Sequence, residues 1–320
     1  MAEHDTQRMQ CMEVWGGNQP VDSGVVMAGL DAWVFSRPYA GASAGGDVHY
    51  VSSCATGRIT RLLVADVSGH GSAVAETSLA LRSLMRRYVN FIDQTQFVRS
   101  LNDEFTSLSE SGTFATAVVT TYFAPSGEIS LCNAGHPPPL LYRAKTRTWS
   151  LVEASDRPTA GRADADTGPS NLPLGIIDLA SYEQFSLRLR TGDLVLCYTD
   201  SLIESKNAAG EMLQPAGLLE IVRSLNVSDP SALIPALIEA IRKLNPDNLT
   251  EDDVTMLLFR PNGLAPAAPF WQRVLAPLRV VGAIARSFLP GGGPAPWPEM
   301  SLSNLLGLRH KSRVPEFQEK

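Results

Sequence analysis

Short apolar runs separated by turn residues dominate the first part of the chain, and they predict β-strands. The pattern becomes strand-like from residue 25, turns at the Gly/Ala/Ser segment 41–46 and resumes at 47–52. The run 59–67 is apolar and bounded by glycines, as expected for a central strand. Residues 1–24 are expected to form a loosely ordered lead-in.

The spacing of apolar residues changes after residue 71. Steps of three and four over 74–92 predict an amphipathic helix, and a second helix is expected over 96–108. Two further helices are expected near 215–225 and 230–244. Asp229 is a suitable N-cap for the last one, with Pro230 as its first residue. Pro235 should delay the start of this helix or bend it.

Strand patterns return between and after these helices. Hairpin-length connections join most of them, and residues 153–171 carry little apolar content, so they are expected to form a surface loop. The expected strands are 114–123, 129–132, 140–143, 148–152, 182–189, 194–199 and 254–260. The order strands, two helices, strands, two helices, strand predicts an α+β fold with antiparallel sheets flanked by helices.

Composition sets the limits of this domain and excludes some functions. The pattern divides the chain into the lead-in 1–24, a domain at 25–261 and a Pro/Gly-interrupted amphipathic extension at 262–320. A formal net charge of −6 gives no support for nucleic-acid binding. No uninterrupted apolar run is long enough to cross a membrane. Four scattered cysteines without a paired spacing indicate reduced thiols and a cytoplasmic location.

Aspartates stand where several of the expected strands begin or end, and they are the main candidates for chemistry. Asp66 opens the segment Ala65-Asp66-Val67-Ser68-Gly69-His70-Gly71, whereas Asp47, Asp200 and the pair Asp252/Asp253 adjoin other strands. Taken alone, Asp66 is equally well explained as a turn or capping residue, and for the other aspartates that explanation is the better one. Together they predict an oxygen-ligand site for Mg²⁺ or Mn²⁺, and no His/Cys cluster favours zinc. Two such ions activate water and neutralise a phosphoryl group.

Two histidines and two serines offer other chemistry. His70 lies nearest to the aspartates and is an acid candidate, although a structural hydrogen bond explains it equally well. His136, within Asn133-Ala134-Gly135-His136-Pro137-Pro138-Pro139, is better explained by a rigid turn near the site than by catalysis. Ser68 and Ser72 lack the Gly-x-Ser-x-Gly context of a serine hydrolase, which leaves that function as a minor alternative.

Seven motifs in one order resemble the SpoIIE/RsbU branch of the PP2C-like (PPM) metal-dependent serine/threonine phosphatases. The resemblance covers roughly residues 25–260. The motifs are Ala44-Gly45-Gly46-Asp47, Val64-Ala65-Asp66-Val67-Ser68-Gly69-His70-Gly71, Gly112-Thr113-Phe114-Ala115-Thr116-Ala117, Asn133-Ala134-Gly135-His136-Pro137-Pro138, Leu172-Pro173-Leu174-Gly175, Tyr198-Thr199-Asp200 and Glu251-Asp252-Asp253-Val254-Thr255.

The resemblance implies an α-β-β-α sandwich with two Mn²⁺ or Mg²⁺ ions at one edge of its sheets. It implies that Asp66 bridges the ions and that the Val67 carbonyl and Asp47 serve one of them. Asp200 and Asp252 would serve the other, with Asp253 as a neighbour. The family hydrolyses phosphoserine or phosphothreonine without a phosphoenzyme.

The chain departs from the family pattern in two places. Ser201 follows Asp200 where the family usually has glycine, so strain or a reshaped loop is expected at this position. The lead-in is shorter than the sensor domain of many relatives, so control is expected from another chain or from the C-terminal segment.

The sequence therefore predicts a bacterial cytoplasmic protein phosphatase that acts by a metal-activated water. Its implied substrate is a phosphorylated STAS-type anti-sigma-factor antagonist in partner-switching signalling. A catalytically weak phosphatase-like binding module is the alternative, motivated by Ser201. Residues 266–320 are expected to pack on the domain or pair two protomers, rather than dock on a partner or an acidic membrane.

Overall fold

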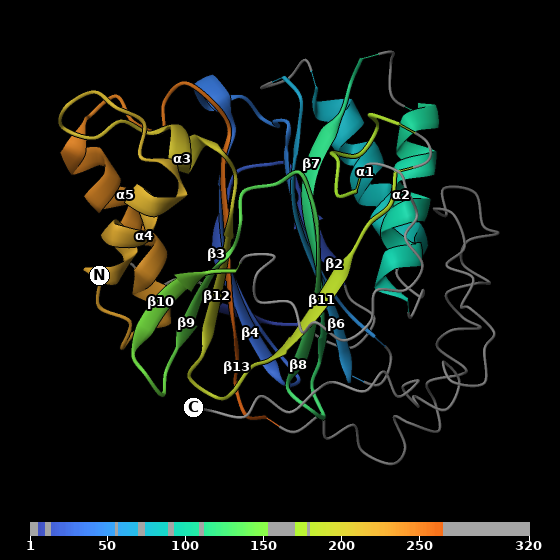
Figure 1. Cartoon of the computed structure of the whole chain (residues 1–320), viewed down its shortest axis with the longest axis horizontal. Coiled ribbons are helices and arrows are strands. Elements are labelled where there is room, and N and C mark those ends of the chain that lie inside the picture. Colours follow the sequence, from blue (N-terminus) through green and yellow to red (C-terminus); the bar gives the residue numbers. More distant parts are fainter. Residues whose placement is uncertain are drawn as a thin grey trace.

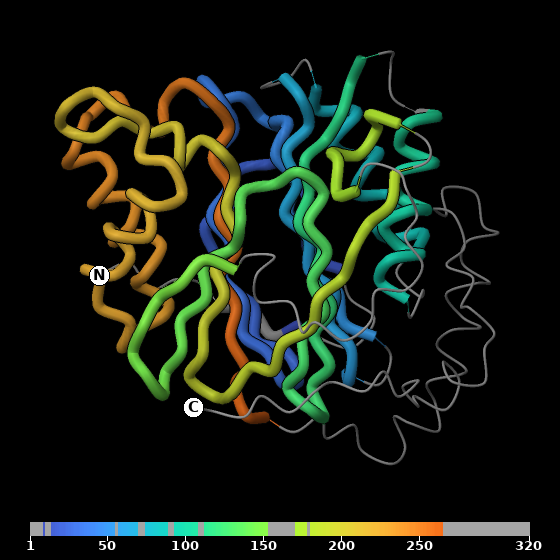
Figure 2. The backbone as a smooth tube through the Cα atoms, in the orientation of Figure 1, coloured from blue at the N-terminus to red at the C-terminus, as the bar shows by residue number. Residues whose placement is uncertain are grey.

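Two β-sheets pack face to face, and helices cover the outer face of each (Figures 1 and 2). This computed structural model describes residues 6–9, 14–54, 57–69, 74–88, 93–108, 112–152, 170–177 and 180–264. The layers are helix, sheet, sheet, helix, so the predicted α+β sandwich is confirmed.

The first sheet contains strands from both ends of the described chain. Its order is β1 (Thr6–Arg8), β3 (Val21–Met27), β4 (Leu30–Arg37), β13 (Val254–Pro261), β12 (Leu194–Tyr198), β9 (Leu140–Arg143) and β10 (Thr148–Leu151). All neighbours are antiparallel except β1 and β3, which are parallel.

The second sheet is antiparallel throughout. Its order is β11 (Gln184–Arg188), β8 (Glu128–Ala134), β7 (Ala115–Phe123), β6 (Ile59–Val67), β5 (Asp47–Ser53) and β2 (Val14–Gly17). Strand β6 lies between β5 and β7, as its continuous apolar run predicts.

The helices form two pairs, one on each side of the sandwich. Helices α1 (Ala75–Tyr88) and α2 (Gln94–Leu108) cover the second sheet, and α4 (Gln214–Arg223) and α5 (Leu233–Leu244) cover the first (Figure 1). Short helical segments among the described residues include η1 (Tyr39–Gly41), α3 (Ser201–Glu204) and η4 (Pro230–Ala232).

Three hydrophobic clusters hold the four layers together. One fills the space between the sheets and includes Leu62, Val118 and Leu257. The other two lie under the helix pairs, around Leu237 on one side and Phe105 on the other. Because both faces of each sheet are covered, strands such as β12 are buried along their whole length and read as continuous apolar runs.

The expectation of a loosely ordered lead-in at residues 1–24 is wrong for its described part. Strand β1 pairs with β3, which starts at Val21, and β2 pairs with β5. These strands are short and only partly buried, so their hydrophobic pattern is weak. Both sheets therefore extend into residues before 25.

The helical expectations agree with the structure in position and differ in detail. Asp229 caps η4 by accepting a hydrogen bond from the Ser231 amide, and α5 starts only at Leu233. Pro235 then lies in the first turn of α5, where the missing amide hydrogen costs no helical hydrogen bond. The predicted loop over 153–169 and the segment 265–320 lie outside the described residues. Within the described residues, every helix is too short or too polar to cross a membrane.

Replacing Leu257 by alanine should destabilise the protein by about 2–5 kcal/mol, because this side chain is fully buried between the sheets. Leu79→Ala is the matched control, since Leu79 on α1 is 40% exposed and should change stability by less than about 1 kcal/mol. Urea denaturation of both variants measures the difference. Equal losses would contradict the assignment of Leu257 to the central core.

Candidate functional site

Asp47 and Asp66 face each other on neighbouring strands of the second sheet. Asp47 is the first residue of β5 and Asp66 the last but one of β6, and the antiparallel register pairs them directly. Directly opposed residues of an antiparallel pair point to the same face, with Cβ atoms about 5 Å apart. The two carboxylates therefore share one edge of the space between the sheets.

The first sheet brings its aspartates to the same edge. Asp200 lies two residues after the end of β12 and Asp252/Asp253 directly precede β13, and these two strands are antiparallel neighbours. The end of one strand and the start of the other consequently lie together, beside α3 at the upper edge in Figure 1. The Thr199 hydroxyl spans the two sheets and donates to Asp47 Oδ2 over 2.9 Å. It also accepts from the Thr255 amide at 3.0 Å.

Asp253 organises the loop in front of Asp47. Its Oδ1 accepts from the Tyr39 amide at 2.6 Å and its Oδ2 accepts from the Gly46 amide at 2.7 Å. A Cβ on Gly45 would overlap the Asp253 carboxylate, which explains the glycine at this position. Since both oxygens of Asp253 already accept backbone hydrogen bonds, its position beside the other carboxylates fits a supporting residue better than a metal ligand.

Burial and mutual repulsion shift the titration of these carboxyl groups. Burial, and after it the negative charges of the other four aspartates, raise the pKa of Asp66 to about 10. Burial also raises the pKa of Asp47, although the Thr199 hydrogen bond opposes the shift. Burial likewise raises the pKa of Asp200. Without a cation, the carboxyl groups at this edge therefore cannot all be ionised at the same time.

The chemistry of these donors fits a hard divalent cation. Carboxylate oxygens from both sheets face one edge, with the backbone of Val67 beside them, and Mg²⁺ and Mn²⁺ prefer such ligands. The described side chains do not include a ready-made cluster of three or more His, Cys, Asp or Glu ligands. The described carboxylates thus lie along one edge but are not already arranged around a single metal position.

Ser201 adopts an ordinary helical backbone, so the strain expected from the missing glycine is wrong. It is the first residue of α3, and it is not among the described non-glycine residues with positive φ. Glycine is therefore not required by backbone geometry at this position. The Ser201 side chain is buried, and its hydroxyl has no hydrogen-bond partner among the described residues.

The structure describes only one of the two candidate histidines. His70, with its neighbours 71–73, lies outside the described residues, so its role stays a prediction. His136 is buried and its Nδ1 lies 2.8 Å from Thr116 Oγ1, in the rigid turn that the proline-rich motif indicates.

Sequence reasoning missed three side chains near the carboxylates. Thr199 and Thr116 belong to recognised motifs, but only the sheet register places them beside Asp47 and Asp66. Glu204 lies one helical turn after Asp200. Burial, and then the charges of Asp200 and Asp252, raise its pKa. The i, i+4 spacing from Asp200 is the signal that predicts Glu204 once α3 is known.

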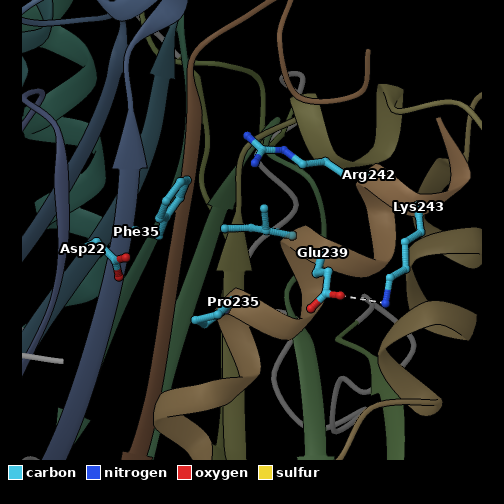
Figure 3. Close-up of a pocket in the computed structure, with 7 residues that line it drawn as sticks. Asp22, Phe35, Pro235, Glu239, Arg242 and Lys243 are labelled. Carbon is cyan, nitrogen blue, oxygen red and sulfur yellow. Dashed lines mark ion pairs between the residues drawn. The ribbon is translucent and has the colours of Figure 1, made fainter. Parts of the chain in front are cut away.

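A separate pocket of about 420 Å³ lies on the opposite side of the first sheet (Figure 3). Helix α5 contributes Pro235, Glu239 and Arg242, and the strands contribute Asp22 and Phe35. Glu239 and Lys243 form an ion pair across one helical turn, at 2.7 Å. The pocket contains none of the candidate metal ligands and so lies apart from the carboxylate edge.

Comparison with known proteins gives a family match over most of the domain. The family described as Stage II sporulation protein E (SpoIIE) matches residues 56–262, about two thirds of the chain. The phosphoserine phosphatase RsbU of Bacillus subtilis (strain 168) is 24% identical over 200 residues, which cover 62% of this chain and 55% of RsbU. The chain thus spans about half the length of this relative.

Several solved structures have the same fold. The RsbU and RsbW domains of Rv1364c from Mycobacterium tuberculosis match with a TM-score of 0.58 and 25% identity, over 84% of this chain and 75% of that one. The PP2C phosphatase domain of SpoIIE from Bacillus subtilis gives 0.56 and 18%, over 79% and 64%. RsbX in complex with magnesium gives 0.53 and 16%, over 76% and 100%. The expected PP2C-like sandwich is therefore confirmed.

Replacing Gly45 by alanine should destabilise the protein by about 1–3 kcal/mol, because the new methyl group displaces the Asp253 carboxylate from the Tyr39 and Gly46 amides. Gly17→Ala is the matched control, since the nearest atom to a Cβ there is 3.9 Å away. Thermal unfolding compares the two. A Gly45→Ala protein as stable as Gly17→Ala would show that the carboxylate moves without cost.

Asp66→Asn should stabilise the metal-free protein, and the gain should grow with pH. The pKa of Asp66 is raised in the folded state, so the stability associated with its proton is present below the unfolded pKa of 3.8 and is lost as pH rises towards about 10. The asparagine variant does not suffer this loss. With a chelator present, we expect a gain on the order of 1–3 kcal/mol larger at pH 8 than at pH 5.

Urea titrations at both pH values measure this gain. Asp22→Asn, at an exposed position on β3 in the first sheet, is the control for the loss of a carboxylate away from this edge. A gain for Asp66→Asn that is equal at the two pH values would show that Asp66 is not held among like charges.

Proposed function

The chain belongs to the SpoIIE family, and we propose that it is a metal-dependent phosphatase of phosphoserine and phosphothreonine in proteins. The observation that carries this proposal is the meeting of aspartates from both sheets at one edge, held by the hydrogen bond from Thr199 to Asp47. The phosphoserine phosphatase activity in the name of RsbU supports the same reaction.

We assign the metal ligands on the family pattern and the sheet register together. Asp66 is the residue that would bridge two Mn²⁺ or Mg²⁺ ions, because the other four aspartates all lie close enough to raise its pKa. Asp47 and the Val67 carbonyl would complete one ion's protein ligands. Asp200 and Asp252 would serve the other, with Asp253 and Ser201 beside them. Magnesium in the structure of RsbX supports the choice of a hard cation.

The described residues prepare this edge for phosphate chemistry. When bound, the ions supply an activated water and neutralise phosphoryl charge. The strands hold Asp47 and Asp66 in fixed register, and Asp253 holds the loop that leads into Asp47. His70 stays the acid candidate through its place in the Asp66 motif. No side chain of a strained nucleophile elbow is required by this assignment.

The protein substrate is proposed from the relatives. RsbU is 24% identical, and the structure from Mycobacterium tuberculosis joins an RsbU domain to an RsbW domain in one chain. We therefore place the protein in bacterial partner-switching signalling and the cytoplasm, with a phosphorylated STAS-type anti-sigma-factor antagonist as substrate. This chain spans 55% of RsbU.

The alternative function is a phosphatase-like module that binds without turnover, and the main reason for proposing it no longer holds. Ser201 was the residue that suggested it, and Ser201 adopts a right-handed helical backbone without strain. All the predicted aspartate ligands are present at the shared edge. The alternative makes a clear prediction of no metal-dependent hydrolysis.

Hydrolysis of an aryl phosphate should depend on Mn²⁺ and should fall by at least about 100-fold in Asp66→Asn and in Asp200→Asn. Asp22→Asn is the control and should retain activity, because Asp22 lines the pocket on α5 away from the carboxylate edge. Steady-state kinetics with and without a chelator measure the effect. Turnover that ignores the metal, or that survives both aspartate changes, would exclude the proposal. Incubation with phosphorylated STAS proteins of the same genome then tests the substrate.

A further inference from the structure

The turn that carries His136 is fixed at its backbone on both sides. Asn133 Oδ1 accepts from the His136 amide at 2.7 Å, and Asn133 Nδ2 donates to the His136 carbonyl at 2.8 Å. Gly135 has φ of +68°, and a Cβ at this position would overlap the Pro173 ring. The turn therefore needs glycine before His136. Its fixed backbone sets the direction in which the imidazole projects.

The imidazole points to the strand next to Asp66. His136 is 5% exposed, and its Nδ1 lies 2.8 Å from Thr116 Oγ1. Thr116 is the direct partner of Asp66 in the register of β6 and β7, so the two side chains lie on the same face. Thr116 remains partly exposed, as Asp66 does. The hydroxyl that His136 orients thus stands beside the central carboxylate.

Burial keeps the imidazole neutral. It lowers the pKa of His136 to about 3, and a smaller effect of the Tyr198 backbone opposes this shift. Nε2 has no hydrogen-bond partner among the described residues, so the contact that fixes the ring is the one between Nδ1 and Thr116.

We propose that His136 is a positioning residue that holds the Thr116 hydroxyl on β7 in place beside Asp66. The inference rests on the proposed metal-dependent function and adds a residue to it. The neutral ring accepts the Thr116 hydroxyl hydrogen at Nδ1 and carries its own proton on Nε2. This contact beside Asp66 is the counterpart of the hydrogen bond that Thr199 donates to Asp47.

The chain offers a matched pair of substitutions to test this role. Thr116→Val removes the hydroxyl that contacts His136 and keeps the shape of the side chain. Thr120→Val makes the same change four residues further along β7. The Thr120 hydroxyl is buried and has no partner among the described residues. His136→Asn keeps an amide near the Nδ1 position, and His136→Ala removes the contact with Thr116.

Manganese affinity of the folded protein is the first readout, measured by calorimetry with Mn²⁺ alone. We expect His136→Ala and Thr116→Val to weaken binding by about 10–100-fold, and Thr120→Val to leave it unchanged. His136→Asn should recover part of the loss. The double variant of His136→Ala and Thr116→Val should bind as weakly as either single variant, because both break one connection. Equal affinities in Thr116→Val and Thr120→Val would overturn the proposal.

The second readout is independent of metal. Nitrogen NMR of the histidine rings in the metal-free protein should find His136 neutral between pH 5 and 8, with its proton on Nε2. Thr116→Val should shift these signals and Thr120→Val should not. A proton on Nδ1 overturns the proposal. A wild-type protein that binds no manganese would overturn the proposed function instead, while the NMR result still decides whether His136 holds the Thr116 hydroxyl.

Discussion

Like charges held at one edge of two sheets are the constraint on which the rest of this structure depends. Aspartates repel one another when ionised, and burial makes the repulsion stronger. The sandwich keeps them together because each stands at the end of a strand whose length is buried in one of three hydrophobic clusters. The single hydroxyl of Thr199 then joins the sheets where the charges meet. Packing of the strands therefore supplies the free energy that holds the aspartates together, and strand register fixes their positions relative to one another.

The parts of the site differ in how firmly the fold holds them. Asp47 and Asp66 lie within a strand pair, so their separation cannot change without a change in the sheet. Asp200 and Asp252 lie just outside β12 and β13, so their positions depend on local contacts. Asp253 supplies one of these contacts through two backbone amides, and it fixes the loop from Tyr39 to Gly46 at the same time. The carboxylate that is least suited to bind a cation is thus the one that secures the others.

Most of the fold could be predicted from the spacing of apolar residues along the chain, because both faces of each sheet are covered. Strand β6 and helices α1 and α2 have long, regular patterns, and the structure reproduces them. The strands before residue 25 escaped prediction because they are short, partly buried edge strands whose partners are distant in sequence. Helix α3 escaped because four residues hold less than two turns of pattern.

The candidate site could be predicted in its residue types and not in its supporting contacts. Aspartates at strand ends are visible in sequence, whereas the roles of Thr199 and Gly45 depend on pairing between residues far apart in the chain. Ser201 shows the opposite error. A rule about glycine predicted strain there, and the helix that starts at Ser201 makes the rule irrelevant.

The place of β13 in the first sheet has a consequence for how the protein is made. This strand comes last among the described elements, yet it lies between β4 and β12 in the middle of its sheet. A ribosome exposes β4 long before β13, so the first sheet stays divided until the strand after Asp253 emerges. The second sheet needs no residue beyond Arg188 and can close earlier. Sheet closure with such separated partners is slow. The nascent chain therefore lacks an assembled carboxylate edge until its synthesis has passed residue 261.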